Sequence, residues 1–146
     1  MTTLYTTAED AEEAFYEAIG RADLDALMAT WSDDEEIVCI HPTGQRMDGH
    51  AAIRESWRSI FESNPRFSVH IRSKIRWQSL LLCVHSVVET LYLENDRTTH
   101  HGPMLTTNVF IRGANGWRLL SRHTSAAAEA SDGENDDLDT KQHTLH

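Results

Sequence analysis

A change in hydrophobic periodicity at Pro65 constrains the fold of this chain more than any other feature of the sequence. Before Pro65, apolar residues recur three or four apart, which is the spacing of one face of an α-helix. The pattern predicts a helix that ends at Gly20, a second that begins at Asp23 and a third that ends near Pro65. The β-branched run at residues 37–40 predicts one short strand among these helices.

From Phe67 onward, apolar and polar residues alternate, as they do in strands with one buried face. The next run, residues 80–93, is apolar on both faces and therefore needs a cover on each side. After a predicted turn at 94–99, two further strands are expected at 104–112 and 117–125. Helices followed by a run of strands predict an α+β domain, with the helices on one face of the sheet and a second subunit on the other.

The length of 146 residues and the mass of 16.6 kDa fit one domain. The formal net charge is −10, and residues 129–146 contribute about half of it through six acidic residues and one lysine. We therefore divide the chain into a domain at 1–127 and an acidic, flexible tail at 128–146. An acidic body argues against nucleic-acid binding, which depends on neutralising phosphates. The sequence has neither a membrane-spanning run nor a secretion signal, so we expect a cytoplasmic protein without a membrane partner.

Five short motifs occur in order along the chain: D-L-x-A-L at 23–27, W-x-D-D at 31–34, C-I-H-P at 39–42, G-x-x-A-I-R-x-x-W at 49–57 and G-W-R-L-L-S-R-H-T-S at 116–125. Together they resemble the SnoaL-like branch of the nuclear transport factor 2-like superfamily. Relatives in that superfamily include ketosteroid isomerase and the association domain of calcium/calmodulin-dependent kinase II. The resemblance implies a cone-shaped (cystatin-like) fold, in which a curved antiparallel sheet wraps around helices and encloses a pocket. It also implies a homodimer through the outer face of the sheet.

The resemblance to ketosteroid isomerase places three positions at the site, and this sequence departs from the isomerase at each of them. The base position is His41, the oxyanion tyrosine corresponds to Phe15 with Tyr16 beside it, and the protonated aspartate corresponds to Asn108. Steroid isomerisation is therefore not implied. The kinase association domain uses a pocket arginine where this chain has Thr124, so shared anion binding is not implied either.

A different site remains possible, because His41 can exchange a proton near neutral pH. If the register of the isomerase holds, alternate residues of the last strand point into the pocket and bring His123 and Asn108 near His41. We predict these three residues as catalytic. The predicted wall of the pocket consists of mostly apolar residues: Phe15, Tyr16, Trp31, Trp57, Leu119 and Ser121.

Two functions stay open at this point. The first is a pocket for a small, partly apolar molecule, with isomerase- or cyclase-type acid–base catalysis by His41. The second is a non-catalytic association module, in which His41 is a structural residue. His85 and Glu89 share one face of their strand and would line either the pocket or the subunit interface.

The remaining candidate groups favour ordinary structural roles. Neither cysteine lies in a C-x-x-C motif, so buried thiols are expected, and the adjacent His100 and His101 lack an acid or cysteine at ligand spacing. We expect no metal and no cofactor. A basic stripe would share the polar face of the first long strand, either binding an acidic surface or remaining solvated: His70, Arg72, Lys74 and Arg76.

Overall fold

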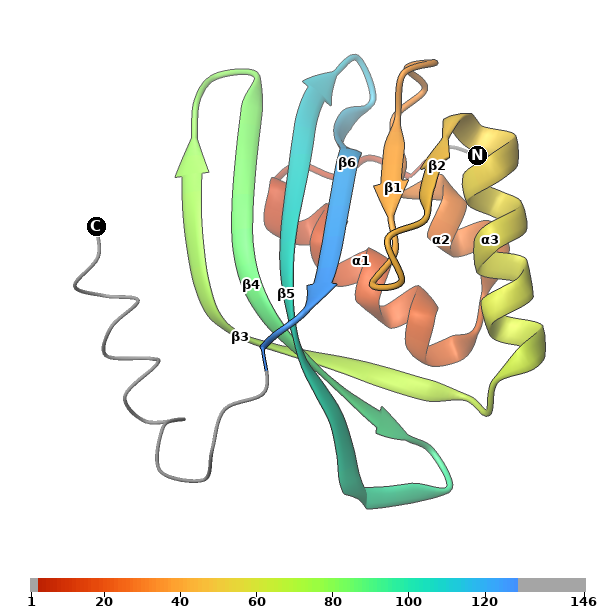
Figure 1. Cartoon of the computed structure of the whole chain (residues 1–146). Helices are drawn as coiled ribbons and strands as arrows, with labels where there is room; N and C mark the ends of the chain where they lie inside the picture. Colours follow the sequence, from red (N-terminus) through yellow and green to blue (C-terminus); the bar gives the residue numbers. More distant parts are fainter. Residues whose placement is uncertain (1–2, 129–146) are drawn as a thin grey trace.

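The computed structural model describes residues 3–128, and the acidic segment that we predicted as a tail lies outside the described residues. Three helices lie on the inner side of one curved sheet (Figure 1). The helices are α1 (Ala8–Arg21), α2 (Leu24–Ala29) and α3 (Gly49–Ser63). The strands are β1 (Val38–Ile40), β2 (Arg46–Asp48), β3 (Phe67–Gln78), β4 (Leu82–Leu93), β5 (Asp96–Gly113) and β6 (Gly116–Ala126).

The sheet has the strand order β2-β1-β6-β5-β4-β3, and β1 runs parallel to β6 while every other neighbouring pair is antiparallel. The predicted α+β class is therefore confirmed. Two details of the prediction are wrong. Helix α1 continues through Gly20 to Arg21 and ends where Ala22 adopts a left-handed conformation with φ 51°. Strand β5 begins at Asp96, inside the segment expected to be a turn.

The core lies between the helices and the inner face of the sheet. Phe15 on α1 packs edge-on against the rings of Trp31 and Trp57, with centroids 6.5 and 5.7 Å away. Ile53 on α3 and Leu119 on β6 are almost completely buried in the same cluster. Because α1 carries both apolar and polar residues on its buried side, the helix also brings polar groups to the inner face of the sheet.

Two β-bulges decide which side chains reach that inner face. In β3, Ser73 and Lys74 both lie opposite Val87, because Arg72 pairs with Val88 and Ile75 pairs with Ser86. A bulge inserts one extra residue into a strand and reverses the side to which the following residues point. Lys74 therefore turns inward, and the predicted basic stripe along one face is wrong.

The second bulge lies in β6 at Leu120, since Val109 pairs with Ser121 and Phe110 pairs with Leu119. Beyond it, Arg122 and Thr124 are buried and His123 is exposed. The predicted inward orientation of His123 is therefore wrong. Among the described residues, no helix is long and apolar enough to cross a membrane.

Candidate ligand pocket and buried charge network

A bidentate ion pair between Arg122 on β6 and Glu89 on β4 lies on the inner face of the sheet. The guanidinium donates from Nη1 to Glu89 Oε2 at 2.7 Å and from Nη2 to Oε1 at 3.0 Å. The Tyr16 hydroxyl, from α1, donates to the same Oε2 at 2.6 Å. Both charged residues are at least 95% buried, so the pair must satisfy itself within the protein.

A second half of the network is centred on Glu12 of α1. Asn108 Nδ2 donates to Glu12 Oε2 at 3.2 Å and also contacts the Tyr16 oxygen at 3.0 Å, which joins the two halves. His85 Nδ1 lies 2.9 Å from Glu12 Oε2, and Lys74 Nζ lies 2.7 Å from Oε1. The inward turn of Lys74 at the β3 bulge thus supplies the cation that balances Glu12.

The pKa values of this network follow from burial and from the neighbouring charges. Burial alone would raise the pKa of Glu12, but the hydrogen bonds and charges of His85 and Lys74 together lower it. Burial raises the pKa of Tyr16, so its hydroxyl remains a donor. Burial would lower the pKa of Arg122, yet the charge and hydrogen bonds of Glu89, together with the smaller contributions of Tyr16 and Cys39, outweigh this and raise it. Each carboxylate of the network thus faces a cation, Glu89 facing Arg122 and Glu12 facing Lys74.

A mostly apolar cavity of about 140 Å³ adjoins the ion pair. Arg122 and Glu89 are the charged residues among those that line it, and the other polar lining groups are His41 and Thr124. The remaining lining residues are apolar: Ile19, Pro42, Trp57, Ile60, Phe67, Val69, Leu91 and Met104. A concave, largely apolar space with a few fixed polar groups has the composition of a small-molecule site.

His41 follows β1 and is 9% exposed. The loop after it is closed by two backbone hydrogen bonds, from His41 N to Gln45 O and from Gly44 N to His41 O. Its Nε2 lies 2.9 Å from Ser56 Oγ, and the Ser56 hydroxyl donates to the Ile53 carbonyl at 2.8 Å. Because that hydroxyl has one proton, His41 must donate from Nε2, which leaves Nδ1 as the basic nitrogen.

Burial lowers the pKa of His41, and the positive charge of Arg122 lowers it further. The imidazole is therefore neutral at pH 7 and can accept a proton. A larger hollow of about 690 Å³ lies between α3 and the loop after β1, and three residues line both hollows: His41, Pro42 and Ile60. We call the first space the inner cavity and the second the outer groove.

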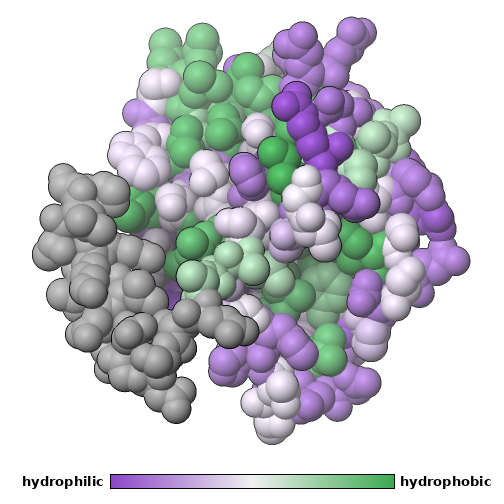
Figure 2. All heavy atoms as spheres, in the orientation of Figure 1, coloured by the Kyte–Doolittle hydropathy of each residue, from purple (hydrophilic) through white to green (hydrophobic). Residues whose placement is uncertain are grey.

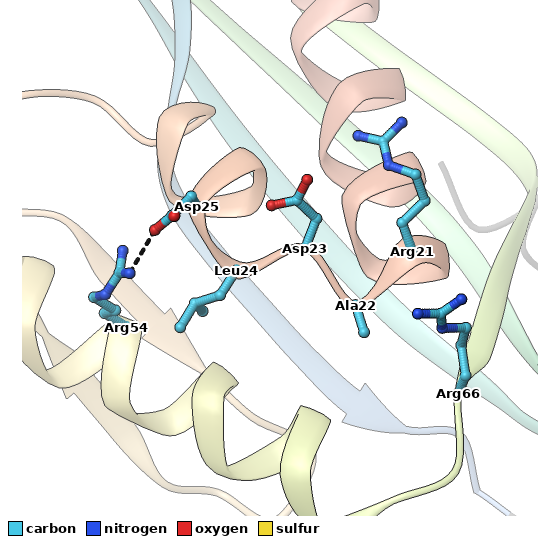
Figure 3. Close-up of a pocket in the computed structure, with 7 residues that line it drawn as sticks. All are labelled: Arg21, Ala22, Asp23, Leu24, Asp25, Arg54 and Arg66. Atoms are coloured by element: carbon cyan, nitrogen blue, oxygen red, sulfur yellow. Dashed lines mark hydrogen bonds and ion pairs between the residues drawn. The ribbon is translucent and has the colours of Figure 1, made fainter.

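A third hollow, beside the turn between α1 and α2, lacks these features. Arg54 pairs with Asp25 on one side of it, while Arg21 and Arg66 stand on the other (Figure 3). The charged groups that line it are exposed or half-buried, so the hollow is a polar surface region without a desolvated group.

The structure brings some of the predicted site residues together and separates others. His41 and Trp57 line the inner cavity, whereas Asn108 lies in the buried network behind Arg122. His123 points away from both. The other predicted wall residues do not line the inner cavity. Tyr16 belongs to the network, and the half-buried Ser121 lies on the outer side of β6. The remaining three belong to the core: Phe15, Trp31 and Leu119.

Sequence reasoning missed Arg122, Glu12 and Lys74. Two of these residues, Arg122 and Lys74, follow β-bulges, and a simple alternation places both on the outside. Glu12 was hidden among the many acids of α1, although it stands one helical turn before Tyr16. That spacing was the available signal, because residues four apart share a helix face.

Neither metal nor thiol chemistry finds a site among residues 3–128. These residues contain no group of three or more potential metal ligands with suitable geometry. Cys39 and Cys83 are free and buried, and burial raises the pKa of each thiol. Both thiols are therefore protonated at neutral pH and poor nucleophiles.

Comparison with known proteins identifies related chains. Residues 8–129 match the SnoaL-like domain family. A crystal structure from Thiobacillus denitrificans, provisionally named a calcium/calmodulin-dependent protein kinase type II association domain, is 34% identical and superposes with a TM-score of 0.80. The match covers 86% of this chain and 98% of that one.

Two further relatives extend this comparison. A structure from Streptomyces avermitilis, provisionally named a dehydratase of the NTF2-like family, is 22% identical with a TM-score of 0.72, covering 82% of this chain and 92% of that one, and it supports the fold alone. The F-box protein SKIP8 of Arabidopsis thaliana is 30% identical over 114 residues, which is 76% of this chain. This chain covers 46% of that curated relative, so it spans about half of its length.

Proposed function

The chain belongs to the SnoaL-like domain family of NTF2-like folds, and we propose that it binds a small, uncharged carbonyl compound in the inner cavity. One observation carries this proposal: the Glu89–Arg122 ion pair adjoins an apolar cavity beside a neutral His41. Since Glu89 already neutralises Arg122, a charged ligand would add an unbalanced charge to a buried space. An uncharged polar group adds none.

The same residues could carry out isomerase- or cyclase-type chemistry. A C–H bond next to a carbonyl would lose its proton to Nδ1 of His41, and the electron pair would move to the carbonyl oxygen as an enolate. The imidazolium formed at His41 would balance the charge of that oxygen, and the guanidinium of Arg122 beside it would stabilise it further. Returning the proton to the same carbon, or to another carbon of the enolate, would complete the reaction without any external oxidant or reductant.

Proton exchange into a ketone tests this proposal directly. Cyclohexanone is close in size to the inner cavity, and its α-protons exchange for deuterium in D₂O at a rate that NMR can follow. We expect the full chain to accelerate this exchange, His41→Gln to abolish the acceleration and Ser59→Ala, in the outer groove, to leave it unchanged. Binding without faster exchange would mean that the protein binds the ketone but does not catalyse its reaction. Absence of binding would overturn the proposal.

A second candidate function, association of two copies, is favoured by the outer face of the sheet. Three cross-strand rows make up this face: Arg72–Val88–Leu105–Ser125, Ile75–Ser86–Thr107–His123 and Trp77–Val84–Val109–Ser121. None of these twelve residues is acidic, although the chain has 23 acidic residues. Apolar side chains also gather over the β3–β4 hairpin, at the upper left of Figure 2. The exposed large apolar residues of this hairpin include Leu80, Leu81 and Leu82, and Trp77 at the end of β3 is 57% exposed.

We therefore propose that two copies pair through the outer face. The solution mass, measured by light scattering over a range of concentrations, tests this pairing. Trp77→Ser should lower the mass towards that of the monomer. Leu4→Ser removes an equally exposed apolar residue outside these rows and should leave the mass unchanged. A monomeric wild-type chain at high concentration would contradict the pairing.

A further inference from the structure

The outer groove lies next to the inner cavity and has no assigned role. It is lined by residues of α3, of the loop after β1 and of β2, and most of its surface is apolar. His41, Pro42 and Ile60 form the wall that it shares with the inner cavity. A single layer of side chains therefore separates a group bound near His41 from the outer groove. The groove is almost five times as large as the inner cavity, since the volumes are about 690 and 140 Å³.

The volume of the inner cavity limits what it can hold. A cavity of about 150 Å³ accommodates one molecule of the size of benzene. A larger ligand must extend beyond it, and the shared wall of His41, Pro42 and Ile60 separates it from the outer groove. Ile60 is only partly buried, and a change in the rotamer of an isoleucine at the edge of the core opens a path at little cost.

The charges along the outer groove indicate what kind of chain could lie there. Glu55 is the charged residue among those that line the groove, and both of its oxygens accept hydrogen bonds from Arg58, at 2.8 and 2.6 Å. Met47 on β2 and Ala52 on α3 contribute apolar surface to the groove. Neither hollow therefore has an unbalanced charge to attract an ionic ligand.

We infer that the outer groove binds the hydrocarbon chain of a ligand whose carbonyl group occupies the inner cavity. The ligand class is then an uncharged linear ketone, aldehyde or ester with a saturated or unsaturated chain, longer than the inner cavity alone can hold. This inference rests on the proposed function of the inner cavity, to which it adds chain length as the property that the protein recognises.

A series of linear 2-alkanones from butan-2-one to decan-2-one tests the inference, with binding measured by NMR chemical shifts of the full chain. Burial of one methylene group strengthens binding about fourfold. We expect the dissociation constant to fall by about this factor for each methylene once the inner cavity is full. Ala52→Phe fills the groove. In this variant the dissociation constant should no longer fall with chain length for long ketones, and the dissociation constant of butan-2-one should stay unchanged.

Ala51→Phe provides the matched control, because Ala51 precedes Ala52 on α3, is exposed and does not line the groove. It should behave as the wild type throughout the series. Ile60→Ala removes part of the shared wall and should strengthen the binding of decan-2-one more than that of butan-2-one. Affinities that do not depend on chain length, or a loss in Ala52→Phe that is equal for short and long ketones, would overturn the inference while leaving the inner cavity as a binding site. Failure of every ketone to bind would instead overturn the proposed function.

Discussion

The two faces of the curved sheet are formed by the same strands but carry different kinds of side chain. On the inner face, one cross-strand row brings together Arg76, His85, Asn108 and Arg122. Acids of α1 contact the first two, and Glu89 of β4 pairs with Arg122. On the outer face, the neighbouring rows have no acid and several exposed apolar residues. Charge is thus buried on the side that the protein covers itself, whereas apolar surface remains on the side that it leaves open.

The side chains of the two faces therefore depend on different contacts for their stability. The inner network is completed within one chain, so its energetic effects should be independent of protein concentration. Within residues 3–128 no element covers the apolar surface of the outer face. If a second copy shields this surface from water, the effects of substitutions there should vary with protein concentration. Substitutions that are matched in size but placed on opposite faces can separate the two cases.

The largest effect is expected from Glu89→Gln. The substitution keeps the shape of the side chain but leaves the charge of Arg122 buried without its carboxylate, which typically costs about 3–5 kcal/mol. The free energy of unfolding, measured by urea denaturation, should fall by this amount. The double variant Glu89→Leu/Arg122→Met removes both charges and should recover most of the loss.

Glu62→Gln serves as the control for that experiment. Glu62 also pairs with an arginine, but its side chain is 71% exposed, so its loss should change the unfolding free energy by less than about 0.5 kcal/mol. If Glu89→Gln cost no more than Glu62→Gln, the buried pair would not be the constraint that we describe.

A smaller effect should distinguish the faces on one strand. Val87 and Val88 are neighbours on β4 and are 2% and 8% exposed, but the first points inward and the second belongs to the outer face. Val87→Ala should cost about 1–2 kcal/mol at every protein concentration, as expected for methyl groups lost from a core. If two copies pair through the outer face, the cost of Val88→Ala should grow with protein concentration, because pairing would stabilise the wild type more than the variant. Equal and concentration-independent losses would contradict the pairing through the outer face.

Much of the fold was predictable because it depends on patterns that extend over many residues. The change of period at Pro65, the cap at Asp23 and the five ordered motifs led to the α+β fold and the family. His41 was predictable as a residue of interest, because a titratable side chain that ends an apolar strand is unusual. These signals are local or additive, so single-residue shifts elsewhere do not erase them.

The composition of the site was less predictable, because it depends on two single-residue insertions. Alternation assigns His123 and Ile75 to the inside and Arg122 and Lys74 to the outside, and each bulge reverses that assignment for the residues that follow it. Neither Ser73 nor Leu120 has a side chain that signals a bulge. The inward cations find their acids on other elements, Lys74 on Glu12 of α1 and Arg122 on Glu89 of β4, and these contacts join segments that are distant in the sequence.

A pH titration of stability should then reveal the neutral histidine. The pKa of His41 lies below its usual value in the folded protein, so the unfolded chain binds more protons near pH 6. The contribution of the neutral His41 to the free energy of unfolding should be complete above about pH 6.5. It should decrease as the pH falls towards the lowered pKa of His41 in the folded protein. His41→Gln should lose this part of the dependence. The further loss of stability as the pH falls below about 4.5, towards the lowered pKa of Glu12, should persist. Identical profiles between pH 7 and 5 would mean that His41 is not held neutral by its surroundings.

The smallest effect concerns the bulge that turns Lys74 inward. Ser73 has a φ of 55°, a left-handed conformation that costs a residue with a Cβ atom about 1 kcal/mol relative to glycine. Ser73→Gly should therefore stabilise the protein by up to about 1 kcal/mol, and Ser73→Val should destabilise it by at least as much, because a β-branched side chain fits this conformation poorly. Ser68→Gly on the same strand, where the backbone is extended, is the control and should be destabilising. A loss of stability in Ser73→Gly as large as that in Ser68→Gly would show that the strand does not need the bulge. The backbone conformation at Ser73 would then not explain why Lys74 points towards Glu12.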